Sequence, residues 1–288
     1  MLQYRLKEWI FLNEIYVLND GYALPKIGLG TYGLRGMQGV RQIEQAIQMG
    51  YRLIDSAYNY ENEGIVGQAI RQSGVSRDQI TLTSKLPGRY HEYDKAMIAI
   101  QESVARTGLD YIDLYLIHWP NPIEDKYVEA WQALIDSQKA GLIRSIGTSN
   151  FLPEHIDRLE KETGVLPTVN QVETHPNFNQ QAQVEYDQSK GIITEAWSPI
   201  GRAAESMQNE VIQSIADKHN RTIYQIVLRW HIQRGFVPIP KSSNYQHQLQ
   251  NISIFDFELT QEEVDMINAL SREDGRQKNQ DPAEYQEF

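Results

Sequence analysis

The chain has 288 residues, of which 41% are hydrophobic, with a formal net charge of -11 and no cysteine. The acidic balance and the lack of a basic run argue against nucleic acid and anionic membrane surfaces as partners. The sequence offers no disulfide, no thiolate nucleophile and no apolar run near the roughly 20 residues of a membrane span, which fits a cytoplasmic protein.

Residues 1–17 are partly apolar, but Lys7, Glu8 and Glu14 interrupt any signal-peptide core. We expect an N-terminal extension of uncertain structure there, either an added surface strand or helix or an overlong start. A single domain is expected over residues 18–288, and it should open with an N-terminal hairpin.

The stretch Gly28–Gly33 spells G-L-G-T-Y-G, a literal match to the dinucleotide-binding pattern G-x-G-x-x-G, and an acidic strand end follows about 20 residues later. The context argues against a Rossmann turn, which needs a strand that feeds directly into a helix. Pro25 interrupts the approach, and Gly36 and Gly39 each cost a helix about 1 kcal/mol. The first convincing helical pattern starts near Val40. A Rossmann dehydrogenase is therefore a distant alternative.

Short β-rich runs recur at intervals of about 25 to 35 residues, each followed by an amphipathic stretch. The expected strands end near Thr31, Asp55, Lys85, His118, Asn150, Gln171, Ser198 and Lys241. Helical patterns between them include residues 94–107, 126–140 and 153–162. Eight such units without a Gly/Ser/Pro-rich linker indicate a closed (β/α)8 TIM barrel with short active-site loops rather than an open sheet. Gly28 and Gly30 would then lie in the first barrel strand, where missing side chains let backbones and a ligand approach.

Polar residues stand at the ends of three successive expected strands, namely Asp55, Lys85 and His118, and Tyr60 lies in the loop after the first of them. In a barrel these strand ends meet at one mouth. The set suits carbonyl reduction, because an ammonium such as Lys85 beside the Tyr60 phenol makes the phenol a better proton donor. Asp55 would pair with and orient Lys85, and His118 would hydrogen-bond the substrate oxygen. Singly, each residue has an ordinary structural interpretation as part of a buried ion pair or as a packed ring.

The segment Gly50–Glu63, around Asp55 and Tyr60, resembles the signature of the aldo-keto reductase family. The resemblance continues in family order through residues 83–86, 114–120, 146–151, 170–176, 196–201 and 239–242. It implies a barrel that binds a nicotinamide dinucleotide in extended form without a Rossmann fold, NADPH (NADP) and possibly NADH as well. Short loops after His118 and Leu270 resemble the compact bacterial branch that includes 2,5-diketo-D-gluconate reductases and methylglyoxal reductases, and they predict an open pocket.

The resemblance also implies a role for each matching residue. The catalytic tetrad would be Asp55, Tyr60, Lys85 and His118, with Tyr60 as the proton donor. The nicotinamide end of the cofactor would contact Ser149, Asn150, Gln171 and Trp197, the last as a stacking face. The pyrophosphate and adenosine would follow Ser198, Ile200, Gly201, Lys241, Ser242, His247, Gln250 and Asn251. Tyr32 and Trp119 would wall the substrate pocket.

One position departs from the family pattern. Where the family commonly has an arginine that binds the 2'-phosphate of NADPH, this chain has His247. Arginine is always charged and can bind phosphate through two parallel hydrogen bonds, whereas a solvent-exposed imidazole is mostly neutral at neutral pH. We therefore expect a weakened preference for NADPH over NADH.

Together these residues predict an NAD(P)H-dependent reductase of aldehydes and ketones, with a small carbonyl compound as its partner and a monomer as its expected state. The alternative is a non-catalytic relative that binds the cofactor and acts through protein contacts. Glu173 and His175 suggest a metal site, but a catalytic zinc needs about three protein ligands and an open position. No resident metal is expected.

Overall fold

The computed structural model describes residues 14–201 and 209–288. At its centre lie eight strands, paired in parallel in the order β3-β4-β5-β6-β7-β8-β9-β10. Their bounds are β3 (Gly28–Gly30), β4 (Leu53–Asp55), β5 (Thr81–Leu86), β6 (Ile112–Ile117), β7 (Ile143–Ser149), β8 (Val169–Glu173), β9 (Ile193–Trp197) and β10 (Val237–Pro238). A bridge between Gly30 and Lys241 brings the chain after the last strand back to the first, and Gly30 N donates to Pro240 O at 3.2 Å. The predicted (β/α)8 barrel is confirmed.

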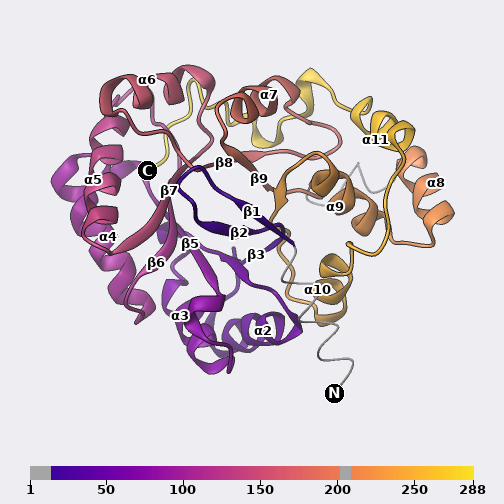
Figure 1. Ribbon diagram of the computed structural model, residues 1–288, viewed down its shortest axis with the longest axis horizontal. Helices are drawn as coiled ribbons and strands as arrows, with labels where there is room; N and C mark the ends of the chain where they lie inside the picture. Colours follow the sequence, from indigo (N-terminus) through magenta and orange to yellow (C-terminus); the bar gives the residue numbers. More distant parts are fainter. Residues whose placement is uncertain (1–13, 202–208) are drawn as a thin grey trace.

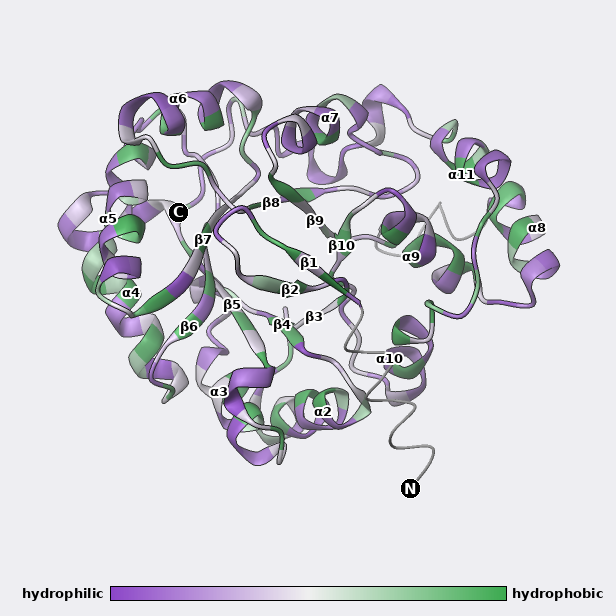
Figure 2. Ribbon diagram, viewed as in Figure 1, coloured by the Kyte–Doolittle hydropathy of each residue, from purple (hydrophilic) through white to green (hydrophobic). Residues whose placement is uncertain are grey.

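A ring of helices surrounds the strands (Figure 1). Their bounds are α2 (Gly36–Met49), α3 (Glu63–Gln72), α4 (Tyr93–Thr107), α5 (Tyr127–Lys139), α6 (Pro153–Thr163), α7 (Gln181–Ser189), α8 (Glu210–His219), α9 (Ile223–Gln233), α10 (Tyr245–Ile252) and α11 (Gln261–Asn268). The three helical patterns named from the sequence are α4, α5 and α6, each matched to within one residue at both ends. Figure 2 shows hydrophilic and hydrophobic residues together along these helices, as expected when one face packs on a sheet and the other meets water.

The start of the first barrel helix differs from the expectation. We expected it near Val40, but α2 begins at Gly36 and includes Gly39. A Cβ on Gly39 would lie 2.6 Å from Cδ1 of Ile65 on α3, so the glycine permits close helix packing that offsets its low helix propensity. Gly33, which a Rossmann turn would place inside the helix, lies before α2 in a left-handed conformation with φ of 77°.

A hairpin of β1 (Ile15–Val17) and β2 (Ala23–Pro25) lies across the strands, as Figure 1 shows. Leu24 of the hairpin packs into the buried cluster of leucine, valine and isoleucine side chains inside the barrel. The Tyr22 hydroxyl donates to Asp113, near the start of β6, at 3.0 Å. The hairpin therefore caps the end of the barrel at which the strands begin. The opposite end, where the strands finish, is the one that carries ligands in barrels of this kind.

Most of the expected N-terminal extension, residues 1–13, lies outside the described residues, and Ile15–Val17 form β1. Among the helices that the structure describes, none is long and apolar enough to cross a membrane.

Candidate active site

A cavity of about 740 Å³ opens at the end of the barrel where the strands finish. The predicted residues that line it are Tyr32, Asp55, Tyr60, His118, Trp119, Ser149, Asn150, Gln171, Trp197, Ser198, Ile200 and Lys241. Its size falls within the range of small-molecule and cofactor sites. The structure thus brings together residues from the ends of most of the strands, as the barrel topology predicts.

Asp55 and Lys85 form a buried ion pair under this cavity. Adjacent parallel strands carry them, and the Lys85 side chain is fully buried. Its ammonium donates to Asp55 Oδ1 at 2.8 Å, to Asp55 Oδ2 at 2.7 Å and to the backbone oxygen of Ser56 at 2.8 Å. Burial by itself would lower the pKa of Lys85, but Asp55 and Tyr60 outweigh burial and raise it. The lysine is therefore a fixed cation whose three donors are all directed by the protein.

Tyr60 ends a short 3-10 turn, η1 (Tyr58–Tyr60), which follows β4. The Nζ of Lys85 lies 5.1 Å from the centroid of the Tyr60 ring. Burial raises the pKa of the Tyr60 phenol, and Lys85 offsets only part of that rise. The ammonium acts in the expected direction, but the net shift is opposite because burial has the larger effect on the phenol and the charge of Asp55 adds to it. A raised pKa keeps the phenol protonated at neutral pH, which a proton donor in carbonyl reduction requires.

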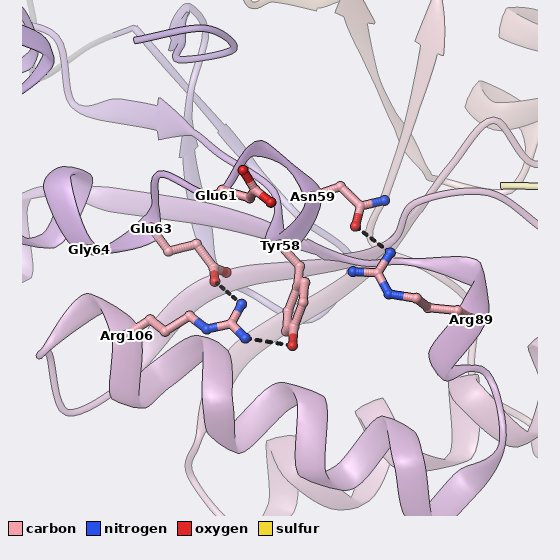
Figure 3. A pocket seen from close by; sticks show the side chains of 7 residues that line it. All are labelled: Tyr58, Asn59, Glu61, Glu63, Gly64, Arg89 and Arg106. Carbon is pink, nitrogen blue, oxygen red and sulfur yellow. Dashed lines mark hydrogen bonds and ion pairs between the residues drawn. The ribbon is translucent and has the colours of Figure 1, made fainter. Parts of the chain in front are cut away.

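A second cavity, of about 540 Å³, is lined by Tyr58 and Asn59 of the turn that ends at Tyr60 (Figure 3). Arg106 donates to the Tyr58 hydroxyl at 2.5 Å and stacks its guanidinium over the Tyr58 ring, 3.8 Å from the centroid. Arg89 donates to Asn59 Oδ1 at 2.6 Å. Both arginines are drawn beside the turn in Figure 3, so they hold the two residues that precede Tyr60. These contacts restrain the turn next to Tyr60, which lines the larger cavity.

Ser149, Asn150 and Trp197 bond to one another at the ends of β7 and β9. Trp197 Nε1 donates to Asn150 Oδ1 at 2.8 Å, and Asn150 Nδ2 donates to Ser149 Oγ at 3.0 Å. Ser149 Oγ donates to the backbone oxygen of Gln171 at 2.9 Å. Asn150 Nδ2 also donates to the backbone oxygen of His118 at 3.0 Å, so both amide hydrogens have partners, while Oδ1 keeps a lone pair that a carboxamide N–H could use. The role of these residues in cofactor binding stays a prediction.

Gln171 connects Asp55 to Glu195, a carboxyl that the sequence reasoning missed. Gln171 Nε2 donates to Asp55 Oδ2 at 2.9 Å and to Glu195 Oε2 at 2.8 Å, which leaves its amide oxygen for a ligand. Glu195 is fully buried on β9, and its Oε1 has no hydrogen-bond partner among the described protein atoms. Burial, followed by the charge of Asp55, raises the pKa of Glu195 to about 8. An acid within the short β-rich run Ile193–Trp197 was the available sequence signal.

Glu195 is expected to make the protein less stable as the pH rises. The pKa of Glu195 in the folded protein, about 8, lies above the ordinary value of 4.5. The contribution of this residue to the free energy of unfolding is therefore fully present below pH 4.5 and is lost as the pH rises from 4.5 to about 8. Glu195→Gln resembles the protonated acid and cannot ionise. Relative to this variant, the wild-type free energy of unfolding should fall by more than about 1 kcal/mol across that window, as measured by chemical denaturation.

The exposed acid Glu262 gives a matched control for this measurement. Glu262→Gln should differ from the wild type by a nearly constant free energy over the same pH window. A constant difference for Glu195→Gln as well would show that the Glu195 carboxyl is already ionised in the folded protein.

The last segment of the described chain, residues 277–288 (the tail segment), also lines the cavity. It contributes Lys278, Gln280, Tyr285 and Glu287, none of which the sequence reasoning selected. Trp119 packs on Tyr285 with ring centroids 4.4 Å apart. The expected open pocket therefore has a wall on this side.

Tyr32 lies nearby and is 65% exposed, with its ring centroid 5.1 Å from that of Tyr60. The two predicted substrate residues thus line the same cavity as Tyr60 and His118 of the predicted tetrad, Tyr32 against Tyr60 and Trp119 against the tail segment.

Most of the residues predicted to contact the adenosine end of the cofactor lie outside the cavity. Lys241 lines the cavity, whereas Ser242, His247, Gln250 and Asn251 lie outside it, in and just before α10, and Gly201 also lies outside. His247 is exposed, and its ring stacks on Tyr224 with centroids 6.3 Å apart. Their contacts with a cofactor stay predictions.

The metal alternative gains no support from the structure. Glu173 and His175 lie close together, with Oε1 and Nε2 3.0 Å apart, and Gln277 N also donates to that Glu173 oxygen. Within residues 14–201 and 209–288 there is no group of three or more His, Asp or Glu side chains placed to hold a metal.

Comparison with known proteins agrees with this geometry. Residues 26–272 match the Aldo/keto reductase family. The chain is 47% identical over 271 residues to 2,5-diketo-D-gluconic acid reductase B of Corynebacterium sp., covering 94% of this chain and 97% of that protein. It is 42% identical over 264 residues to glyoxal reductase of Bacillus subtilis, covering 91% and 95%. The crystal structure of a Gox0644 mutant in complex with NADPH is similar with a TM-score of 0.90 and 38% identity, covering 94% and 98%. The chain therefore belongs to the aldo/keto reductase family.

Proposed function

We propose that this protein reduces aldehydes and ketones to alcohols with NADPH. The observation that carries the proposal is the cavity lined by Tyr60, His118 and Asp55, with the buried Lys85 paired to Asp55 beneath it. The named reductases among its relatives and the NADPH in the similar crystal structure support the same activity. The non-catalytic alternative has no observation in its favour.

The cavity fits a nicotinamide dinucleotide in its lining and its chemistry. Trp197 offers an aromatic face, and the free amide oxygen of Gln171 is positioned to accept from a carboxamide. Lys241 lines the same cavity and can meet a phosphate. When bound, the nicotinamide supplies the hydride, and the protein contributes position and electrostatics.

The chain's own residues account for the rest of the reaction. Tyr60 gives its phenolic proton to the carbonyl oxygen, and Lys85 stabilises the phenolate that remains. Asp55 holds Lys85 in place through both carboxylate oxygens. His118 donates a hydrogen bond to the carbonyl oxygen and orients the substrate against Tyr60. In the reverse direction the Tyr60 phenolate accepts the alcohol proton.

The wider assignments belong to the same proposal. We propose a single domain over residues 18–288, which one continuous barrel and its helix ring support. A monomeric, cytoplasmic enzyme is the simplest state for a chain with a net charge of -11 and no cysteine. Some use of NADH is also proposed, because the position of the expected arginine holds His247.

Turnover of a carbonyl panel tests the function directly. The purified protein should oxidise NADPH in the presence of methylglyoxal and other small aldehydes and ketones, followed by loss of absorbance of the reduced nicotinamide. Parallel assays with NADH should show measurable but slower or weaker use. Tight binding of NADPH without turnover of any member of the panel would instead indicate the non-catalytic relative.

A further inference from the structure

The tail segment places the carboxylate of Glu287 against the ring of His118. Glu287 is 8% exposed, and its Oε1 lies 2.7 Å from Nδ1 of His118. The two atoms are close enough for an ion pair when the ring is protonated, and the geometry departs from a linear hydrogen bond. Because Nδ1 is buried against Glu287, Nε2 is the ring nitrogen that remains for a ligand in the cavity.

Several bonds hold Glu287 in place without the help of His118. Asn59 Nδ2 donates to its Oε1 at 2.8 Å, and Gly88 N donates to its Oε2 at 3.2 Å. Asn121 donates to the Glu287 backbone oxygen at 2.8 Å and accepts from the Glu287 backbone N–H at 3.0 Å. A Cβ on Gly88 would lie 2.6 Å from the Glu287 backbone oxygen, so the segment docks where only glycine leaves room. The carboxylate therefore has a place set by the fold.

Glu287 is ionised at neutral pH. Burial alone would raise the pKa of its carboxyl, but His118, Asn59 and Gly88 outweigh burial and hold the pKa below its usual range. The other basic ring beside it is His91, and burial lowers the pKa of His91 to about 4, so that ring is neutral at neutral pH. Arg89 binds the neighbouring backbone oxygen of Phe288 at 3.1 Å. His118 is thus the basic partner of this carboxylate.

The contact with Glu287 affects which ring nitrogen of His118 can donate a hydrogen bond. A neutral ring has one N–H donor and one acceptor nitrogen. Beside a carboxylate at Nδ1, the single proton of a neutral His118 stays on Nδ1, and Nε2 then presents a lone pair that cannot donate to a carbonyl oxygen. Only the imidazolium donates from both nitrogens, and a neighbouring negative charge stabilises that form.

We propose that Glu287 is a positioning residue that keeps His118 protonated while a carbonyl compound is bound, so that Nε2–H polarises the carbonyl oxygen. The inference rests on the proposed reductase function. In the reaction the hydride forms the new C–H bond, and the nicotinamide is oxidised. The π pair of the carbonyl forms the new O–H bond with the Tyr60 proton, while His118 keeps both of its protons. Tyr60 is the other titratable group beside His118, with ring centroids 6.1 Å apart.

Glu287→Gln removes the charge and keeps the size of the side chain. For methylglyoxal with NADPH, kcat/KM should fall about 10- to 100-fold near neutral pH, the usual consequence of losing a charge-assisted contact. Part of that loss should be recovered at mildly acidic pH, where protons from solution charge the imidazole. NADPH affinity, measured by fluorescence quenching, should be unchanged, and Glu287→Asp should restore part of the activity.

Glu284 provides the matched control, since it is an exposed glutamate of the same segment. Glu284→Gln should keep the wild-type kcat/KM and pH profile. Unchanged kcat/KM and pH profile for Glu287→Gln would overturn the inference. Equal losses of activity and NADPH affinity would also overturn it, because the segment would then only support the fold. A wild-type enzyme that turns over no carbonyl compound would refute the proposed function itself.

Discussion

Tyr60→Phe is expected to lower kcat for carbonyl reduction by about 10²- to 10⁴-fold, the range typical of general acid catalysis. The substitution removes only the phenolic oxygen and its proton, so the ring keeps its edge-on contact with Tyr32. NADPH affinity should therefore stay within a few-fold of the wild type. Single-turnover measurements with NADPH and methylglyoxal isolate the chemical step.

Tyr111 offers a control far from the cavity. Its ring lies between the guanidinium groups of Arg77 and Arg144, each 4.2 Å from the centroid, and phenylalanine preserves both contacts. Tyr111→Phe should keep wild-type turnover. If Tyr60→Phe retains more than about a tenth of the wild-type rate when chemistry limits turnover, another group donates the proton.

His247→Arg should strengthen NADPH binding by about 10- to 100-fold and leave NADH binding little changed. The gain corresponds to the roughly 1.5 to 3 kcal/mol of a charge-assisted hydrogen bond to the 2'-phosphate, which NADH lacks. In the wild type, the phosphate should favour a protonated imidazole, so NADPH affinity should increase as the pH falls from about 8 to 6. After correction for the phosphate's own titration, the arginine variant should show a flatter profile.

Gln246→Arg places the same charge on the adjacent residue of α10, which is also exposed. Successive helical residues point about 100° apart, so this control should give a much smaller gain. Equal gains from the two variants would indicate a general electrostatic effect. No gain for either cofactor, or equal gains for both cofactors, would mean that His247 does not meet the 2'-phosphate.

The barrel and the polar ends of its strands were predictable because hydrophobic runs and helical patterns alternate at a regular interval. Asp55 and Lys85 end successive strands, and parallel pairing leaves few other places for them than one shared mouth. The predicted start of α2 near Val40 was wrong because the prediction used helix propensity alone and did not include the close packing of Gly39 on Ile65. Tertiary contacts of this kind override local preference.

The tail segment could not be placed by the same reasoning. Its polar, irregular sequence carries no periodicity, so nothing local indicates that Glu287 returns to His118 or that Tyr285 covers Trp119. Glu195 was overlooked for another reason. Its environment depends on Gln171 from the neighbouring strand, and that contact appears only when the barrel interior is assembled.

The pairing that closes the barrel is short, and this determines where the folded protein is expected to open transiently. The chain returns to β3 through the contacts of Gly30 with Pro240 and Lys241, next to a strand, β10, of only 2 residues. Short pairings of this kind separate more readily than long ones, so transient opening should concentrate along this line. Gly30 and Lys241 both border the large cavity. A ligand that contacts both residues binds only the closed barrel and therefore stabilises it. Bound ligand should then slow proteolysis and amide hydrogen exchange along this line.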